Sequence, residues 1–352
     1  MGPHKILTTT SNLVPTGLND QVVAVVNWQT AMKLAIRSEA RLRDELNLPK
    51  AVTGDTNAFS TFVPLEFLAK IRPGDPDDPL LRQVLPTASE LVDASGFVAD
   101  PVGDLAMKVA PGVLRKYQGR ALVIATGACG IHCRYCFRRE FPYAESGISN
   151  DWDQSLKYLR EDTEIEEVLL SGGDPLTLVD QKVDRLLSDL ESINHIKRVR
   201  IHSRMPVVIP QRVTTELVQR LKASRLTAWM VIHANHPNEL GDDVVQATDR
   251  MVDAGIPVLN QAVLMRGVND DLETLVELCK RLVNHRIQPY YLHQLDRVRG
   301  AAHFEVPVKV GLRLAAELRA RLPGYAVPVY VSEVPGKSST VSYTHLTLPT
   351  KA

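Results

Sequence analysis

Short apolar segments alternate with amphipathic segments along most of the chain from about residue 120 onward. Six apolar, β-rich runs recur at intervals of roughly 30 residues, and stretches with helical periodicity separate them. The runs cover residues 121–126, 166–171, 199–203, 227–234, 257–265 and 288–295. This alternation predicts a parallel sheet whose strands are joined by right-handed helical crossovers.

Two of the intervening segments show the helical period clearly. From Asp271 to Asn284 the apolar side chains fall on one face of a helix, and these are Leu272, Leu275, Val276, Cys279, Leu282 and Val283. The segment from Val183 to Ile193 behaves alike. Both patterns are typical of helices that bury one stripe against a sheet.

The pattern therefore predicts an α/β fold, either a partial (β/α)6 barrel or an open doubly wound sheet. Residues 1–112 read as a mainly helical region, with an amphipathic stretch over 28–46 and a turn-rich segment over 72–79. We expect the core to span residues 113–300 and a short C-terminal segment to span residues 301–339. In both architectures the active site lies at the C-terminal ends of the strands.

Composition narrows the possible functions. The 41 basic and 41 acidic residues of this 352-residue chain balance, so no broad positive field is available for nucleic acid. No apolar run has the length of a signal peptide or a membrane span, which predicts a cytoplasmic protein. Three of the four cysteines lie within eight residues, a spacing that favours metal binding over a disulfide framework.

Polar loops follow all six predicted strands: CGIHCRYCFRR, GGDPL, HSRMP, HANHPNE, NQAVLMRGVND and HQLDRVRG. Glycine and asparagine also form ordinary turns, and a lone histidine is usually structural. Six such loops at one edge of a sheet nevertheless indicate a single polar site built from every unit.

The first of these loops carries Cys129, Cys133 and Cys136 in a CxxxCxxC motif. Three thiolates can bind three irons of a 4Fe-4S cluster and leave the fourth iron open for a ligand. Structural zinc would need a fourth ligand, for which Cys279 lies on the buried face of a helix and His132 has unsuitable spacing. Redox-sensing thiols are a further alternative.

With this motif after its first strand, the chain resembles the radical S-adenosylmethionine superfamily. The resemblance implies that the open iron binds S-adenosylmethionine, which one electron from the cluster cleaves to a 5′-deoxyadenosyl radical. It also implies that Gly172, Gly173 and Asp174, in LSGGDPL, contact the methionyl group of that cofactor.

Residues 73–336 resemble in more detail the lysine 2,3-aminomutases that use pyridoxal phosphate. DPDDPLLRQVLP, SRMPVVIPQRVT, HANHPNEL and QPYYLHQLDRVRGAAHF carry much of this resemblance. It implies conversion of L-α-lysine to (R)-β-lysine by radical 1,2-amino migration. FRREFPY and VRGAAHF resemble the branch that supplies β-lysine for elongation factor P modification; the catabolic aminomutase is the alternative. A reductant such as flavodoxin or ferredoxin is expected, and a homo-oligomer is possible.

By resemblance, Arg138 binds the substrate carboxylate, Asp296 faces the ε-ammonium group, and Glu333 is a second acid. A guanidinium can bind a carboxylate through two parallel hydrogen bonds. A surface salt bridge is the alternative for each of these residues. The aromatic residues that fit the cofactor pocket, or else core packing, are Tyr117, Tyr290 and Tyr291.

The family binds pyridoxal phosphate through a lysine seven residues after the acid that corresponds to Glu333. In this chain that register falls at Thr340, whereas Lys337 lies three residues early. Residues 340–352, TVSYTHLTLPTKA, do not resemble the family and are expected to be a non-native tail of translated adapter sequence. Either the lysine is missing, or Lys337 serves through a shorter turn.

Two other functions remain open at this point. A radical 2,3-aminomutase of glutamate or another amino acid would favour a basic or neutral residue at position 296, and the acid there argues against it. A non-catalytic iron-sulfur or zinc scaffold is the second alternative, and it would require only the cysteines and none of the substrate-binding residues.

Overall fold

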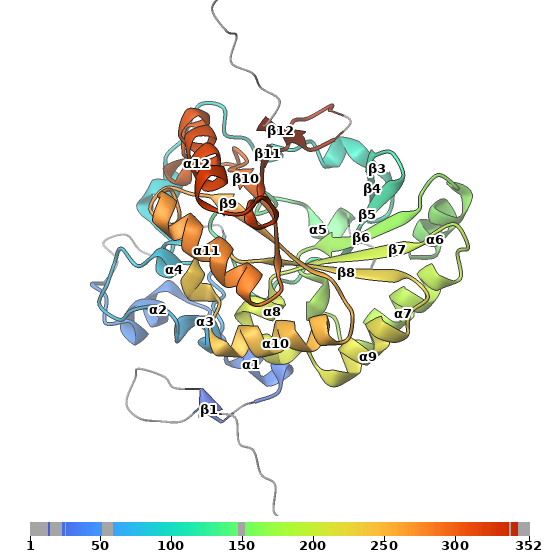
Figure 1. Ribbon diagram of the computed structural model, residues 1–352, viewed down its shortest axis with the longest axis horizontal. Helices are drawn as coiled ribbons and strands as arrows, with labels where there is room; N and C mark the ends of the chain where they lie inside the picture. Colours follow the sequence, from blue (N-terminus) through green and yellow to red (C-terminus); the bar gives the residue numbers. More distant parts are fainter. Residues whose placement is uncertain are drawn as a thin grey trace, which may run out of the picture.

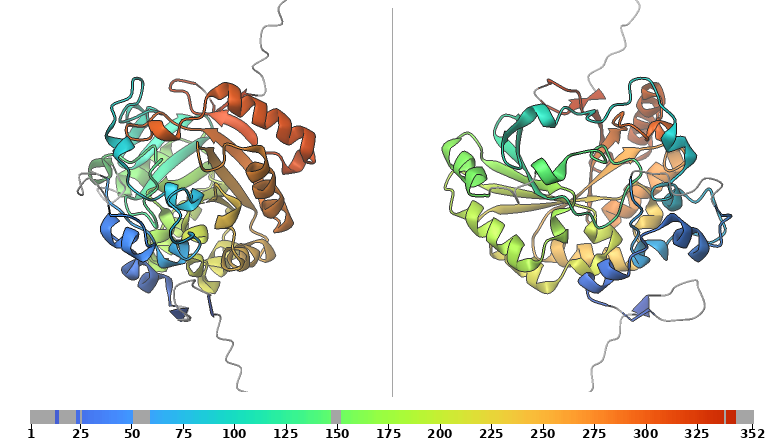
Figure 2. Two further views of the ribbon diagram at one scale, coloured as in Figure 1. Left: turned by 90° about the vertical axis from the view of Figure 1, so that its left-hand side faces the viewer. Right: turned by 180° about the vertical axis from the view of Figure 1, so that it is seen from behind.

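The computed structural model describes residues 26–50, 59–146, 152–337 and 339–343, with the backbone of residues 13–14 and 23–24. These last two segments, β1 (Leu13–Val14) and β2 (Val23–Ala24), pair as an antiparallel ribbon. Of the expected tail, residues 344–352 lie outside the described residues. Figure 2 shows the molecule from two further sides.

One ten-stranded sheet organises the fold, in the spatial order β12-β11-β10-β9-β8-β7-β6-β5-β4-β3. The six predicted strands are confirmed and lie side by side as a parallel set (Figure 1). They are β5 (Arg120–Thr126), β6 (Glu167–Gly172), β7 (Arg198–Ser203), β8 (Thr227–His233), β9 (Val258–Leu264) and β10 (Gln288–Gln294). The C-terminal ends of these strands therefore share one edge of the sheet, as expected from the polar loops that follow them.

Six longer helices cover the outer face of this curved sheet (Figure 1). They are α6 (Trp152–Glu161), α7 (Asp180–Glu191), α9 (Thr215–Ala223), α10 (Asp242–Asp253), α11 (Leu272–Asn284) and α12 (Val308–Arg321). Helix α11 begins where predicted, because the Asp271 side chain accepts a hydrogen bond from the Thr274 N–H at 2.9 Å. Its predicted apolar face is buried at Leu275, Val276, Cys279 and Leu282. Within the described ranges, no helix is both long and apolar enough to cross a bilayer.

Four short strands extend the sheet beyond the predicted set. They are β3 (Lys108–Ala110), β4 (Val113–Tyr117), β11 (Val329–Ser332) and β12 (Val341–Ser342). β11 runs parallel to β10, whereas β3, β4 and β12 pair antiparallel with their neighbours. β12 belongs to the expected tail, and the next residue, Tyr343, stacks on buried Tyr330 with ring centroids 4.7 Å apart. The first residues of that tail thus pack on the sheet.

Short helices make up much of the described N-terminal region. These are α1 (Trp28–Leu34), α2 (Glu39–Glu45), α3 (Leu65–Leu68), α4 (Pro79–Arg82), η1 (Ala88–Leu91) and η2 (Leu105–Met107). The amphipathic stretch over 28–46 is two helices, because Ile36 leaves the helical path and exchanges backbone hydrogen bonds with Val63 at 2.8 and 2.9 Å. The Ser38 side chain then caps α2 by accepting from the Arg41 N–H.

Short turns of helix occupy the loops that follow the parallel strands and complete the C-terminal part. They are α5 (Tyr143–Ser146), η3 (Pro175–Thr177), α8 (Met205–Val208), η4 (Pro210–Arg212), η5 (Pro237–Glu239), η6 (Ala302–Phe304) and η7 (Gly324–Ala326).

The sheet is an open, partial barrel, in agreement with the predicted fold class, since its edge strands β3 and β12 are not paired with each other. Side chains nevertheless connect its two ends. Lys116 on β4 donates a hydrogen bond from Nζ to Glu333 Oε2 at 3.1 Å, and Tyr117 also donates to Glu333, which directly follows β11. The two ends of the curved sheet are thereby held together by polar contacts rather than by a strand pair.

A glycine on α12 allows this helix to lie against β11. A Cβ at Gly311 would stand 2.1 Å from the Tyr330 hydroxyl, whereas a Cβ at Gly324 would meet nothing within 4 Å. We expect Gly311→Ala to lower the free energy of unfolding by about 1–2 kcal/mol, because overpacking outweighs the helix preference of alanine. Urea unfolding checks this, with Gly324→Ala as the control; equal midpoints for both variants would contradict the packing argument.

Candidate active site

The loop after β5 carries the three clustered cysteines. Cys129, Cys133 and Cys136 are free thiols and partly exposed, whereas Cys279 is buried on α11. Burial raises the pKa of Cys136 to about 11, and the charge of Cys133 contributes. Burial also raises the pKa of Cys129, with a contribution from the charge of Cys136. The sulfurs are therefore close enough for neighbouring thiolates to oppose the ionisation of Cys129 and Cys136, an effect that a bound cation would relieve.

The three thiols are soft donors of the kind that bind iron in iron-sulfur clusters. In the described part of the chain, no group of three or more His, Cys, Asp or Glu side chains could hold one metal ion. In a cuboidal cluster each thiolate binds a different iron, so the three sulfurs need not meet at one point. Three neighbouring soft donors on one loop fit such a group.

The glycine pair at the end of β6, Gly172 and Gly173, holds the backbone of the cysteine loop. A Cβ at Gly172, where φ is +114°, would stand 2.6 Å from the Thr126 carbonyl oxygen, and one at Gly173 would stand 2.3 Å from the Ala128 carbonyl oxygen. The Gly173 and Asp174 N–H groups donate to these same two carbonyls, each at 2.7 Å. Glycine is thus required by direct backbone contact with the segment that leads to Cys129.

The buried Asp174 carboxylate connects the loops after β6 and β7. It accepts hydrogen bonds from Ser203 Oγ at 2.7 Å, from the Arg204 N–H at 2.7 Å and from the Met205 N–H at 3.1 Å. Burial raises its pKa, and these donors oppose the rise. Both oxygens of the group predicted to contact a cofactor are engaged by the protein itself.

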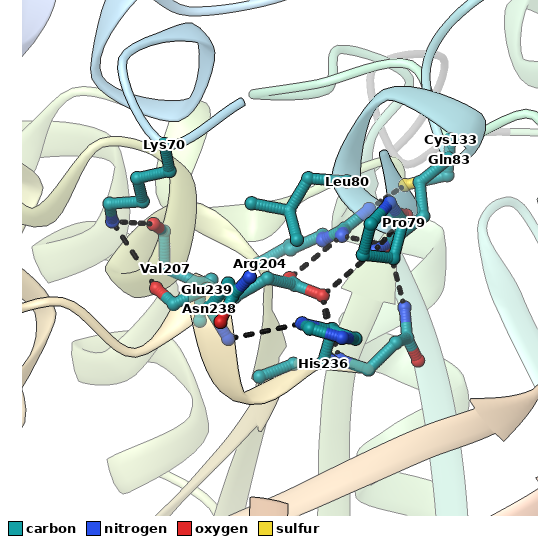
Figure 3. A network of polar contacts seen from close by, with 12 residues as sticks. Lys70, Pro79, Leu80, Gln83, Cys133, Arg204, Val207, His236, Asn238 and Glu239 are labelled. Atoms are coloured by element: carbon teal, nitrogen blue, oxygen red, sulfur yellow. Dashed lines mark hydrogen bonds and ion pairs between the residues drawn. The ribbon is translucent and has the colours of Figure 1, made fainter. Parts of the chain in front are cut away.

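Arg204 is a buried cation next to the cysteine loop, and the sequence interpretation did not single it out. Its Nη1 donates to Cys133 Sγ at 2.8 Å, and its Nη2 contacts Gln83 Oε1 at 2.6 Å and Glu239 Oε2 at 2.9 Å (Figure 3). Its place directly after β7, in HSRMP, was the available signal.

Arg138 follows the last cysteine by two positions and is buried rather than a surface residue. Its Nε donates to Asp104 Oδ2 at 2.8 Å, and its Nη1 donates to Ser171 Oγ at 3.1 Å. Burial acts to lower the pKa of Arg138, but the charge and hydrogen bond of Asp104, together with other nearby negative groups, outweigh it and the pKa is raised. The guanidinium is a fixed, permanent cation at the C-terminal edge of the sheet. Asp104, which precedes β3, had no signal in the sequence.

Two acids, Asp296 after β10 and Glu333 after β11, influence each other electrostatically. Burial raises the pKa of Asp296 to about 7, with the Glu333 charge as the next cause, while Lys116 and Arg138 act in the opposite direction. For Glu333, hydrogen bonds from Tyr117 and other donors outweigh burial and lower the pKa. The site therefore holds one ionised acid and one acid that titrates near neutrality.

Aromatic and imidazole rings of β7, β8 and β10 lie near these charges. Tyr290 and Tyr291 stack with ring centroids 3.7 Å apart. Burial lowers the pKa of His202, of His233 to about 3 and of His293 to about 4. The Nε2 atoms of all three histidines are buried without a hydrogen-bond partner, so they could bond to polar groups of a ligand.

The structure separates the two positions considered for a cofactor-binding lysine. Thr340 Oγ1 donates to Glu333 Oε1 at 2.7 Å, so residue 340 contacts the acid at the end of β11. Lys337 is exposed, and its backbone N–H donates to the Val334 carbonyl at 3.2 Å. Position 340 faces the site residues, and a threonine occupies it.

Several known proteins resemble this chain in sequence. Residues 123–279 match the model of the radical SAM superfamily. The L-lysine 2,3-aminomutases of Escherichia coli and Haemophilus influenzae are 45% and 42% identical, over 89% and 90% of this chain and 93% and 95% of theirs. That of Clostridium subterminale is 40% identical over 88% of this chain and 76% of its own.

Residues 123–279, which include the three-cysteine loop and strands β6 to β9, thus form a radical S-adenosylmethionine domain. The chain belongs to the lysine 2,3-aminomutase family. Membership of the superfamily implies a 4Fe-4S cluster and S-adenosylmethionine. Among solved structures, Streptococcus suis SuiB bound to S-adenosylmethionine aligns with a TM-score of 0.46 and 17% identity, over 64% of this chain and 52% of that one.

The close contact at Gly173 predicts a specific defect. Gly173→Ala must move the Ala128 carbonyl and with it the backbone next to Cys129, because a Cβ there would be 2.3 Å away. We expect the variant to retain less than half of the iron per chain after anaerobic reconstitution. Iron and sulfide analysis measures this, with Gly324→Ala as the control. Full iron content in Gly173→Ala would show that the glycine does not position the loop.

The raised pKa of Asp296 predicts how stability depends on pH. The folded state binds this proton more tightly than the unfolded chain, whose aspartate pKa is about 3.9, so stability is lost as pH rises from about 4 to about 7. Asp296→Asn removes the titration, and its thermal midpoint should exceed that of the unchanged protein increasingly over this range. Exposed Asp44→Asn serves as the control; a constant difference across the range would contradict the raised pKa.

Proposed function

We propose that this protein is an L-lysine 2,3-aminomutase that converts L-α-lysine to (R)-β-lysine by radical 1,2-amino migration. The observation that carries the proposal is the presence of a buried arginine, Arg138, and a half-buried acid, Asp296, which interact electrostatically in one site. A substrate with a carboxylate at one end and an ammonium group at the other suits this pair. The names of the relatives support the same activity.

We propose that Cys129, Cys133 and Cys136 bind the 4Fe-4S cluster and that the Gly172–Asp174 segment borders the S-adenosylmethionine site. When bound, the cluster and S-adenosylmethionine would supply the radical that removes a hydrogen atom from the substrate, and pyridoxal phosphate would supply the electron sink for the migrating nitrogen. The glycine segment already packs against the cysteine loop through two backbone hydrogen bonds. A ligand of the cluster would therefore lie beside it.

The substrate carboxylate is the group we assign to Arg138. Asp104 and Ser171 hold the Nε and Nη1 atoms, so the guanidinium has a fixed orientation before substrate arrives. Such preorganisation reduces the entropy lost when a ligand is positioned.

The substrate ε-ammonium group is assigned to Asp296, with Glu333 as the second acid. An ammonium beside Asp296 would stabilise its ionised form and draw its pKa below about 7. The neighbouring histidines stay neutral at pH 7 because burial lowers their pKa values, so they do not repel the ammonium. This charge distribution selects lysine over amino acids with neutral or acidic side chains, and it disfavours a glutamate aminomutase.

Pyridoxal phosphate as third cofactor rests on the family resemblance and on two features of the site. Tyr117 is an aromatic ring with the Arg120 guanidinium 4.6 Å from its centroid, and Tyr290 stacks on Tyr291. The chain lacks a lysine at the position where the family binds pyridoxal phosphate covalently. Thr340 stands at that position, and Lys337 is exposed. We propose position 340 as the place of the cofactor lysine.

The wider biological role is also a proposal. The resemblance of FRREFPY and VRGAAHF supports an aminomutase that provides β-lysine for elongation factor P modification, with catabolic lysine metabolism as the alternative. Clustered thiols suit a reducing cytoplasm, where a flavodoxin or ferredoxin could supply the electron. We propose the residue boundaries 113–300 and 301–339 for the core and the C-terminal segment.

Restoring the lysine tests the proposed activity. We expect the Thr340→Lys protein, reconstituted anaerobically and supplied with S-adenosylmethionine, pyridoxal phosphate, reductant and L-lysine, to form β-lysine, and the unchanged chain to form at least 100-fold less. Chromatography of the derivatised amino acids measures the product. Cleavage of S-adenosylmethionine without any β-lysine in Thr340→Lys would reject the aminomutase proposal and retain only a radical enzyme.

The two lysine positions are distinguished by absorption spectroscopy. Thr340→Lys should bind pyridoxal phosphate in a form that borohydride reduces to a stable adduct, and adding Lys337→Ala to it should leave the spectrum unchanged. The unchanged chain should give no reducible band. A reducible band in the unchanged chain that disappears in Lys337→Ala would assign the anchor to Lys337 instead.

A further inference from the structure

We propose that Arg204 is a positioning residue that sets the reduction potential of the cluster, through the hydrogen bond from its Nη1 to Cys133 Sγ. This inference rests on the proposed cluster at the three cysteines. The nitrogen-to-sulfur distance is 2.8 Å, and the guanidinium is almost fully buried, with 5% of the residue exposed. The donor is therefore aimed at a sulfur that would be a cluster ligand.

The guanidinium has little freedom to turn away from this sulfur. Its Nη2 is held by Gln83 and Glu239 (Figure 3). The rings of Phe67 and Tyr135 lie 5.4 and 5.6 Å from its central carbon. Its own backbone N–H is fixed by Asp174. A planar fork held at several points keeps its remaining N–H groups in one direction.

Glu239 balances the charge of this arginine and is itself held rigidly. Its carboxylate is fully buried and accepts from the Asn235 N–H at 2.9 Å, the His236 N–H at 3.1 Å and Gln83 Nε2 at 3.0 Å. Next to Cys133 there is thus a hydrogen-bond donor with a positive charge, and behind it a compensating negative charge. The two groups have opposite electrostatic effects on the sulfur.

Reduction adds one electron to an iron-sulfur cluster, and part of that charge resides on the ligand sulfurs. A donor hydrogen bond or a nearby cation stabilises this added charge and raises the reduction potential, whereas a nearby anion lowers it. Loss of Arg204 should therefore make the cluster harder to reduce. Loss of the Glu239 charge should make it easier to reduce.

The test measures the midpoint potential of the cluster in the full-length reconstituted protein, without S-adenosylmethionine, by redox titration followed by electron paramagnetic resonance. We expect Arg204→Gln to shift the midpoint to a more negative value and Glu239→Gln to shift it to a more positive one. Arg204→Lys keeps the charge but loses the planar fork, so its negative shift should be smaller. Opposite shifts from two adjacent buried positions would not arise from general loosening of the fold.

Arg212→Gln is the matched control. Arg212 is also buried in the segment after β7, but it donates to the Leu176 and Leu178 carbonyls and pairs with Asp180 rather than with a cysteine. Its midpoint should equal that of the unchanged protein. If Arg204→Gln does not retain a cluster, the Glu239→Gln variant decides: a more positive midpoint supports the proposal, and an unchanged or more negative midpoint overturns it.

The outcomes separate this inference from the proposed function. No cluster in the unchanged protein would overturn both. A cluster whose midpoint is the same in Arg204→Gln and Glu239→Gln as in the unchanged protein would overturn the inference alone, as would shifts of the same sign in both variants.

Discussion

The contact between the Gly172–Asp174 segment and the cysteine loop is the constraint on which the site depends. Two backbone hydrogen bonds of 2.7 Å join these loops, and a side chain at either glycine would collide with a carbonyl of the other loop. The Asp174 carboxylate then holds the loop after β7, which carries Arg204. Three consecutive strand ends are thereby fixed relative to one another, and the charged groups they carry keep their positions.

Buried charges around this contact occur in pairs with additional hydrogen bonds. Arg204 pairs with Glu239 and Arg138 pairs with Asp104, and all four side chains are almost fully buried. A buried ion pair often adds little net stability, because desolvation of two charges offsets their attraction. Removing one partner alone is costly, however, since it leaves the other charged and unpaired. The pairs therefore account for orientation at the site better than for the stability of the fold.

Much of the fold followed from periodicity alone. The six apolar runs became β5–β10, and the helix expected after Asp271 begins at Leu272, because long elements that bury one face leave a regular pattern. β11 and β12 are only four and two residues long. Such short elements are stabilised by pairing with a neighbouring strand, so they carry too few positions for a period to emerge.

Some residues of the site could also be predicted from the sequence, whereas others could not. The cysteines and the polar loops were evident because strand ends meet at one edge of a parallel sheet. Asp104 was not, since it lies before β3, and only the folded chain brings it to Arg138. The pKa of Asp296 depends on Glu333, Lys116 and Arg138, residues from distant parts of the chain, and no local sequence could give it. Position 340 was identified by counting seven residues from Glu333, and the structure shows that Thr340 donates a hydrogen bond to Glu333.

The central claim is that this site recognises both charged ends of lysine, and binding measurements test it most directly. Isothermal titration of the reconstituted Thr340→Lys protein, loaded with S-adenosylmethionine and pyridoxal phosphate, would compare L-lysine with L-norleucine, which lacks only the ε-ammonium group. The account predicts that L-lysine binds about 10- to 100-fold more tightly, the value of one hydrogen-bonded charge, and that Asp296→Asn removes the difference. Equal affinities of the two amino acids would contradict it.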